Sequence, residues 1–124
     1  MIPKFRARDE RGNWHVGLLT FMFGQYAIVN ETDENTVYLI DKETIGQFIG
    51  LKDKNGVEIF EGDLVEHDDN INGTWETFEA CEIVYDGDYA QFCFKNDASN
   101  FLSYYRNLCI IGNIHENPEL LEDK

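Results

Sequence analysis

The segment that most constrains the fold is residues 50–65, which places two turn signals around a very short strand. Asn55 and Gly56 are typical of a tight turn, because both tolerate the positive φ that hairpin turns need. Residues 57–60 alternate partly apolar and polar side chains, and residues 61–63 form a second turn that leads into a longer apolar run. The segment therefore predicts strands joined by tight turns. It contains no arrangement of groups that could catalyse a reaction.

Most of the remaining chain consists of short apolar, β-rich runs separated by polar turns, which is typical of a barrel or sandwich. Helical signals are confined to two places. Residues 97–106 have apolar side chains at helical spacing, with Ser99 or Asn100 as the N-cap, and Asn117 precedes Pro118 at a favoured helix start. Besides the segment above, strands are predicted at 5–8, 14–23, 26–29 and 36–40, from residue 64 onward, and at 108–114.

Residues 79–94 read as a hairpin, with either Asp86-Gly87 or Gly87-Asp88 as a two-residue loop. Side chains alternate along strands, so either loop places Cys93 on the opposite face from Cys81. A disulfide between them is therefore not expected. Cys81 and Cys109 are interpreted as small buried apolar residues.

Charge is the strongest compositional bias, with 24 acidic and 10 basic residues and a formal net charge of −14. Proteins that bind nucleic acid draw much of their affinity from Lys and Arg on phosphates, so this composition disfavours direct nucleic-acid binding. Binding of a basic protein partner to an acidic surface is more favourable than nucleic-acid binding, because opposite charges steer association. The chain has no apolar run long enough to span a membrane and no N-terminal secretory signal, which favours a cytoplasmic protein.

Few residues offer catalytic or metal-binding chemistry. His67, Asp68 and Asp69 are the one sequence neighbourhood where an imidazole stands beside carboxylates, and they are candidate metal ligands. The alternative is a solvated loop, since residues 68–73 resemble a flexible hairpin connection. No nucleophile motif, phosphate-binding loop or zinc knuckle is recognised, so we predict no catalytic residue and no cofactor.

Three ordered motifs resemble the YopX-like family of phage and prophage proteins. Residues 5–9 are similar to the family's N-terminal motif, although Arg8 stands where the family more usually has Trp. Residues 47–53 together with 59–65 match its central signature, and residues 111–121 resemble its C-terminal signature. The resemblance spans nearly the whole chain.

The resemblance implies a mainly β fold with an SH3-like barrel or pseudo-barrel, an N-terminal β layer and one or two short helices. It divides one domain, residues 1–124, into a β segment (1–49), the barrel (50–116) and a C-terminal turn and tail (117–124). It carries over no catalytic residue. The motif residues are interpreted as structural turn and closure residues: Asp53, Asn55, Gly56, Glu61, Gly62, Asp63, Gly112 and Asn113.

We therefore predict a non-catalytic accessory protein, encoded by a phage or prophage, that acts in the host cytoplasm through protein contacts. The exposed acidic loops predicted at 30–35 and 66–73 are the expected contact surfaces. Self-association is also expected, because aromatic residues are numerous and strand edges must be covered. Two alternatives stay open: an acidic decoy that mimics DNA phosphates, and a metal-dependent hydrolase that uses His67, Asp68, Asp69 and His115.

Overall fold

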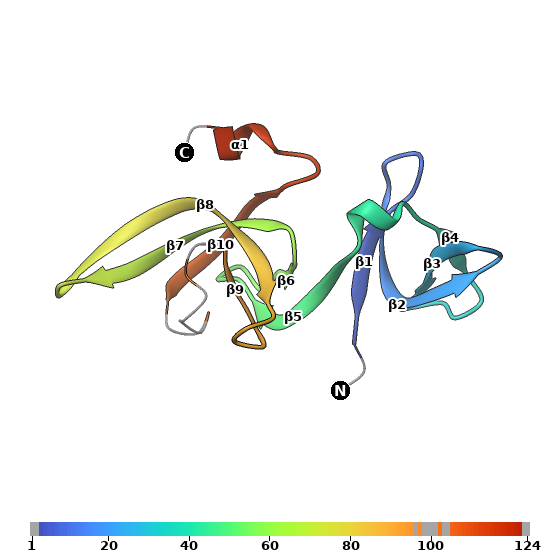
Figure 1. Cartoon of the computed structure of the whole chain (residues 1–124), viewed down its shortest axis with the longest axis horizontal. Helices are drawn as coiled ribbons and strands as arrows, with labels where there is room; N and C mark the ends of the chain where they lie inside the picture. The colour runs from blue at the N-terminus through green and yellow to red at the C-terminus, as the bar shows by residue number, and fades with distance from the viewer. Residues whose placement is uncertain (1–2, 96, 98–101, 103–104, 123–124) are drawn as a thin grey trace. The chain divides into compact units, whose positions relative to one another are not determined.

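The computed structural model describes residues 3–95, 97, 102 and 105–122. These residues form antiparallel strands in two sheets, so the mainly β prediction is confirmed (Figure 1). In chain order the elements are β1 (Phe5–Arg8), β2 (Trp14–Met22), β3 (Gln25–Asn30), β4 (Val37–Leu39), the 3-10 helix η1 (Lys42–Thr44), β5 (Gly46–Lys52), β6 (Glu58–Phe60), β7 (Asp63–Ile71), β8 (Thr74–Asp86), β9 (Gln91–Phe94), β10 (Arg106–Asn113) and α1 (Glu119–Glu122).

The chain forms two compact units, Met1–Phe48 (unit 1) and Ile49–Lys124 (unit 2). Strand β5 begins in unit 1, where it pairs with β1, and ends in unit 2 beside β6. The acidic charge is divided very unequally. Unit 2 holds 17 acidic and 5 basic residues, a net charge of −12, whereas unit 1 holds 7 acidic and 5 basic residues, a net charge of −2.

Unit 1 is built on a sheet in which β4, β3, β2, β1 and the start of β5 are successive neighbours. Ala7, Ile28 and Ile40 form its buried cluster, and apolar side chains including Leu19 and Tyr38 pack against them. The register pairs Leu19 with Ile28 and Ile28 with Tyr38, so the cluster follows one face across three strands. The alternation of side chains along each strand therefore produces this core.

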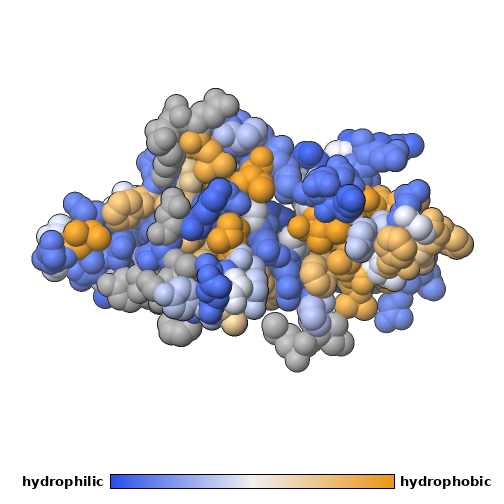
Figure 2. Space-filling view, in the orientation of Figure 1, coloured by the Kyte–Doolittle hydropathy of each residue, from blue (hydrophilic) through white to orange (hydrophobic). Residues whose placement is uncertain are grey.

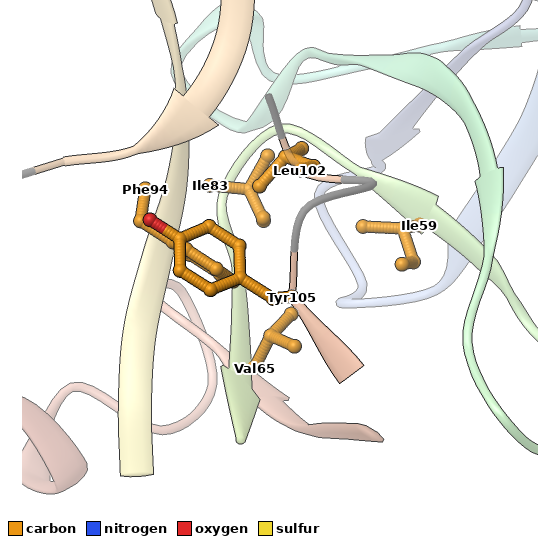
Figure 3. Close-up of a cluster of buried hydrophobic side chains, with 6 residues drawn as sticks. All are labelled: Ile59, Val65, Ile83, Phe94, Leu102 and Tyr105. Atoms are coloured by element: carbon orange, nitrogen blue, oxygen red, sulfur yellow. The ribbon is translucent and has the colours of Figure 1, made fainter. Parts of the chain in front are cut away.

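Unit 2 contains a four-stranded sheet in the order β10, β7, β8, β9. Its core gathers six buried side chains from strands and from the segment before β10 (Figure 3): Ile59, Val65, Ile83, Phe94, Leu102 and Tyr105. Among the described pairings, β9 and β10 are the edges of this sheet, so these strands do not close into a barrel. The closed form of the expected SH3-like barrel is therefore not found.

The acidic segment 66–73 is mostly strand, not the loop that its polar residues suggested. Strand β7 continues to Ile71, which pairs with Thr74 across a two-residue turn. Asn72 and Gly73 have φ of 53° and 87°, as the mirror-image hairpin turns require. We call residues 67–79 the β7–β8 arm; beyond Asp68 its β7 strand pairs with β8 alone among the described strands (Figure 1).

The β8–β9 hairpin corrects a second expectation. Asp86 pairs with Gln91, so the loop has four residues (87–90) and not two. Val84 pairs with Cys93, which places Cys93 on the face opposite Ile83, as expected. Burial of the cysteines differs from the prediction, because Cys93 is fully buried whereas Cys81 and Cys109 are half-buried. Burial, and then the charge of Asp86, raise the pKa of the Cys93 thiol.

Helix α1 begins two residues after Asn117, so the C-terminal helix prediction is confirmed. Most of the helix expected at residues 97–106, with its caps Ser99 and Asn100, lies outside the described residues, and Arg106 already begins β10. No helix in the described part of the chain has the length and apolar character needed to cross a membrane.

Candidate functional site

Asp53 ties three parts of unit 2 together. Its Oδ1 accepts hydrogen bonds from the backbone N–H groups of Asn55 (2.9 Å) and Val57 (3.0 Å), which hold the turn before β6. Its Oδ2 accepts the N–H of Ile110 in β10 at 3.1 Å. The backbone N–H of Gly56 donates to the Asp53 carbonyl at 2.9 Å and closes the same turn. The carboxylate is thus occupied by backbone donors.

The second motif turn links β6, β7 and the chain after β10. Glu61 and Gly62 form the turn, and Gly62 donates its N–H to Ile83 and accepts from the N–H of Ile114, both at 2.9 Å. Asp63 is 1% exposed, and its Oδ2 accepts the N–H of Phe60 at 2.8 Å. These contacts join the turn to β8 and to the C-terminal motif. They are the contacts that a structural role requires.

Gly112 and Asn113 belong to the C-terminal motif and meet Asn117. The Asn113 side chain accepts the N–H groups of His115 (3.0 Å) and Glu116 (2.9 Å), while Oδ1 of Asn117 accepts the N–H of Asn113 at 3.2 Å. A Cβ on Gly112 would lie 2.5 Å from Oδ1 of Asn117, well inside van der Waals contact. Gly112 is therefore required by the close approach of the Asn117 side chain.

We expect Gly112→Ala to lower the free energy of unfolding by about 2 kcal/mol, because Asn117 must move and release its hydrogen bond. Chemical denaturation measures the loss. In an Asn117→Ala background the same change is expected to be much less damaging, because the two closest atoms, Oδ1 and Cγ, are gone and only the Cβ at 3.0 Å remains. Equal losses in both backgrounds would show that the close approach does not limit this position.

Of the three candidate metal ligands, His67 and Asp69 line one hollow, whereas Asp68 does not join them. His67 is buried, and its ring is held among aromatic rings. Asp68 points to the other face of β7, where it accepts Thr77 Oγ1 (2.6 Å) and Asn107 Nδ2 (2.7 Å). These hydrogen bonds, from Thr77 first and then from Asn107, lower the pKa of Asp68. Within the described residues, no three His, Cys, Asp or Glu side chains are grouped as metal ligands, and His115 lies beside Gly62.

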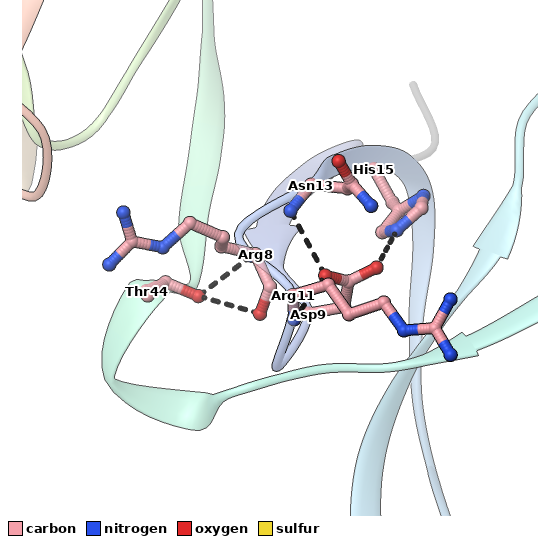
Figure 4. Close-up of polar contacts among 6 residues, drawn as sticks. All are labelled: Arg8, Asp9, Arg11, Asn13, His15 and Thr44. Carbon is pink, nitrogen blue, oxygen red and sulfur yellow. Dashed lines mark hydrogen bonds and ion pairs between the residues drawn. The ribbon is translucent and has the colours of Figure 1, made fainter.

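A pair that the sequence did not predict lies in unit 1, where Nε2 of His15 is 2.8 Å from Oδ2 of Asp9 (Figure 4). Oδ1 of Asp9 accepts the backbone N–H groups of Arg11 (2.9 Å) and Asn13 (3.0 Å). The bond to His15, and then that to Asn13, lower the pKa of Asp9. His15 also stacks on Tyr38, with ring centroids 3.6 Å apart. The predicted polar turn after residue 8 could have indicated this pair, because the short turn of the β1–β2 hairpin brings Asp9 and His15 together.

Beside this pair lies a hollow of about 930 Å³ between the β1–β2 turn and β4. Charged residues of both signs line it: Arg8, Asp9, Glu10, Arg11 and Asp41. Interleaved charges give the hollow no clear preference for an anion or a cation. The Asp9 contacts hold the turn that forms one wall, so we assign them a structural role.

A second hollow, of about 620 Å³, lies in unit 2 where β8 bends, and we call it the acidic aromatic pocket. Its wall includes the rings of His67, Phe78, Phe94 and Tyr105. The His67 ring stacks on Phe94 at 4.1 Å and on Phe78 at 5.7 Å between centroids, and Tyr105 meets it edge-on at 4.6 Å. Ala80 in the wall has a φ of 52°. Non-glycine residues seldom adopt a positive φ, and those that do are found more often near functional sites.

Three carboxylates share the pocket: those of Asp69, Glu82 and Asp97. Asp97 accepts a hydrogen bond from the Tyr105 hydroxyl, and Glu82 lies 3.9 Å from Nζ of Lys95. Asp69 differs, because its buried Oδ1 has no hydrogen-bond partner among the described residues. A buried acceptor without a donor is energetically unfavourable. A ligand that donates an N–H to Asp69 would remove this penalty.

Comparison with known proteins identifies the family. A family model described as YopX protein matches residues 4–122. The chain belongs to the YopX family. The resemblance seen in the three sequence motifs is therefore confirmed.

The YopX chain is also similar to a solved structure, the crystal structure of protein EF1440 from Enterococcus faecalis. The two are 32% identical, the match covers 98% of this chain and 99% of that chain, and the TM-score is 0.55. No curated protein is similar enough to count as a match.

Proposed function

We propose that this YopX protein is a non-catalytic accessory protein of phage or prophage origin that acts in the bacterial cytoplasm by contacting a basic protein. The observation that carries the proposal is the β7–β8 arm, where large apolar side chains are exposed among carboxylates. Ile71, Trp75 and Phe78 are each 39% exposed. Figure 2 shows hydrophobic side chains at the tip of this arm among hydrophilic ones. Exposed aromatic residues of this kind are typical of protein interfaces.

The charge of unit 2 supports a basic partner. The unit's net charge is −12, and Asp68, Asp69, Glu76 and Glu79 lie on the arm itself. A field of one sign attracts a partner of the opposite sign and raises the rate of encounter. The apolar side chains then supply the contact area that holds the complex.

The motif residues support a non-catalytic role. Asp53, Asp63 and Asn113 each accept backbone N–H groups that join neighbouring parts of unit 2. These side chains use their acceptor atoms to hold the backbone in place. A reactive centre would instead direct such groups at a cavity.

We further propose that unit 2 is an open SH3-like pseudo-barrel. Strands β7, β8 and β9 follow one another as a meander, and β10 returns to pair with β7. This order supports the assignment. Small barrels host many unrelated functions, so the proposed role depends on the arm and not on the fold.

The proposal is tested with two matched double variants of the full chain. Ile71→Ser with Glu79→Lys removes one exposed apolar residue and reverses one exposed charge on the arm. Phe23→Ser with Glu34→Lys does the same in unit 1, where Glu34 belongs to the acidic segment 30–35. Each protein is used to capture host proteins from a bacterial lysate at low and high salt, and captured proteins are identified by mass spectrometry.

We expect the unaltered protein and the unit 1 variant to capture the same basic protein, and the arm variant to lose it. High salt is expected to weaken capture, because exposed charges are screened. Equal capture by both variants, or a partner that is not basic, contradicts the proposal. A captured DNA-binding protein that added DNA displaces would instead favour the acidic decoy.

A further inference from the structure

We infer that the acidic aromatic pocket of unit 2 binds the guanidinium group of an arginine side chain. The inference deepens the proposed function, since it names the basic group that a protein partner offers. It rests on the proposed function only for the source of that arginine. The pocket itself can be tested with small molecules.

Asp69 is the main anchor in this site. It lies on the same face of β7 as His67, and its Oδ1 is buried without a hydrogen-bond partner among the described residues. A guanidinium carries five N–H donors in a planar fork that matches a carboxylate. Glu82 is a second carboxylate in the same hollow, where it already lies 3.9 Å from Nζ of Lys95, which also lines the pocket. An arginine can therefore satisfy the Asp69 oxygen while its own charge is balanced.

The aromatic wall suits the flat face of the same group. Phe78 is the most exposed of the four rings, and His67 and Phe94 are stacked behind it. Cations are attracted to ring faces within about 6 Å of the centroid, and guanidinium groups also stack on them. The arm already shows this contact on another part of its surface, where the Arg106 guanidinium lies 3.9 Å from the Trp75 ring centroid.

Other cations fit the pocket less well. A metal ion needs several converging ligands, and the described His, Cys, Asp and Glu side chains offer no group of three. An ammonium group is compact and strongly hydrated, so it loses more hydration than a guanidinium when it is enclosed by rings. The surrounding charge of −12 in unit 2 favours any cation but does not choose among them. The combination of carboxylates and aromatic rings is what favours a guanidinium group over other cations.

The first experiment compares three blocked amino acids by isothermal titration calorimetry and by chemical shifts of the pocket residues. The probes are N-acetyl-arginine methylamide, the matching lysine compound and the neutral citrulline compound, which has nearly the shape of arginine. We expect arginine to bind most tightly, lysine more weakly, and citrulline not at all. Equal binding of arginine and citrulline overturns the inference, as does the absence of shifts at Phe78 and Asp69.

The second experiment uses Asp69→Asn, which keeps the shape and removes the charge, and Asp88→Asn as a control. Asp88 is exposed in the β8–β9 loop, so the control changes net charge equally without touching the pocket. We expect Asp69→Asn to weaken arginine binding about tenfold or more, as the loss of a charge-assisted hydrogen bond implies. We expect no change for Asp88→Asn. Equal affinities of the two variants overturn the inference.

The melting temperature of the Asp69→Asn variant tests the role of Asp69 independently. A residue kept for binding is expected to be suboptimal for folding, so Asp69→Asn should raise the melting temperature by about 3 °C without ligand. A marked fall in melting temperature would show that Asp69 serves the fold, and it contradicts the inference. If no basic partner is captured but the arginine compound still binds, only the proposed partner contact fails. If the partner is captured and the compound does not bind, only the pocket assignment fails.

Discussion

Gly17→Ala is expected to destabilise unit 1 by about 4 kcal/mol or more, a large part of the stability of a small domain. Gly17 lies in β2 between Phe5 of β1 and Asn30 of β3. A Cβ at this position would lie 1.8 Å from the carbonyl oxygen of Val29 and 3.0 Å from the backbone nitrogen of Glu31. Both are backbone atoms, the first in β3 and the second in the residue that follows this strand. The clash can be relieved only by moving β2 and β3 apart, which breaks their pairing.

The measurement uses the two tryptophans of the chain, of which Trp14 lies in unit 1 and Trp75 in unit 2. In a Trp75→Phe background, the fluorescence of Trp14 during denaturant unfolding reports on unit 1. Gly87→Ala in unit 2 is the control, because its Cβ meets nothing within 4 Å and the change should leave the unfolding of unit 1 unaltered. If both variants unfold at the same denaturant concentration, the close approach of β3 to Gly17 is wrong.

Turn chemistry shows why some elements could be predicted and others could not. The turns at Asn55-Gly56 and Glu61-Gly62 are predicted correctly, because these residues suit turn backbone locally, although Asp63 already begins β7. The Asp-Gly signal at residues 86–87 failed, because Oδ1 of Asp86 accepts the N–H groups of Asp88 (2.9 Å) and Tyr89 (3.0 Å). That side chain supports a four-residue loop, and its register is fixed by the pairing of Ile83 with Phe94 in the core.

The polar residues of segment 66–73 predict a loop, whereas the segment is mostly strand. In the structure the β7–β8 arm pairs with no third strand beyond Asp68 among the described residues, so both of its faces can carry polar side chains. The usual apolar alternation is then absent, although Asn72-Gly73 still marks the turn. A strand that is not packed on a core gives little periodic signal.

The pocket could not be found from the sequence. Asp69, Phe78 and Phe94 come from three different strands, and Tyr105 comes from the segment before β10. Their convergence depends on the bend of β8 at Ala80, a residue type that gives no signal for a positive φ. The sequence could supply the individual residue types, including the acidic segment that contains Asp69. The sequence does not show that these side chains converge, because their positions are set by the register of β7, β8 and β9.

Asp53 is expected to control how unit 2 responds to acid. Burial disfavours its charged form, but the N–H groups of Ile110, Val57 and Asn55 outweigh this effect, so the pKa of Asp53 is lowered. A carboxyl with a lowered folded-state pKa stabilises the fold above its unfolded pKa of about 3.9. That stability is lost as the pH falls through the folded pKa. Asp68, whose pKa is also lowered, contributes in the same direction.

Asp53→Asn is therefore expected to cost about 3 kcal/mol at neutral pH, because the amide NH₂ cannot accept the Ile110 N–H as Oδ2 does. As the pH falls through the lowered folded-state pKa of Asp53, the loss should shrink, since the unaltered protein also loses the carboxylate there. Fluorescence of Trp75 in a Trp14→Phe background follows unit 2, with Asp88→Asn as the charge-matched control. A loss that stays constant from pH 7 to the acid limit would mean that the charge of Asp53 does not stabilise the link between the β5–β6 turn and β10. The turn would then be held by its backbone hydrogen bonds alone.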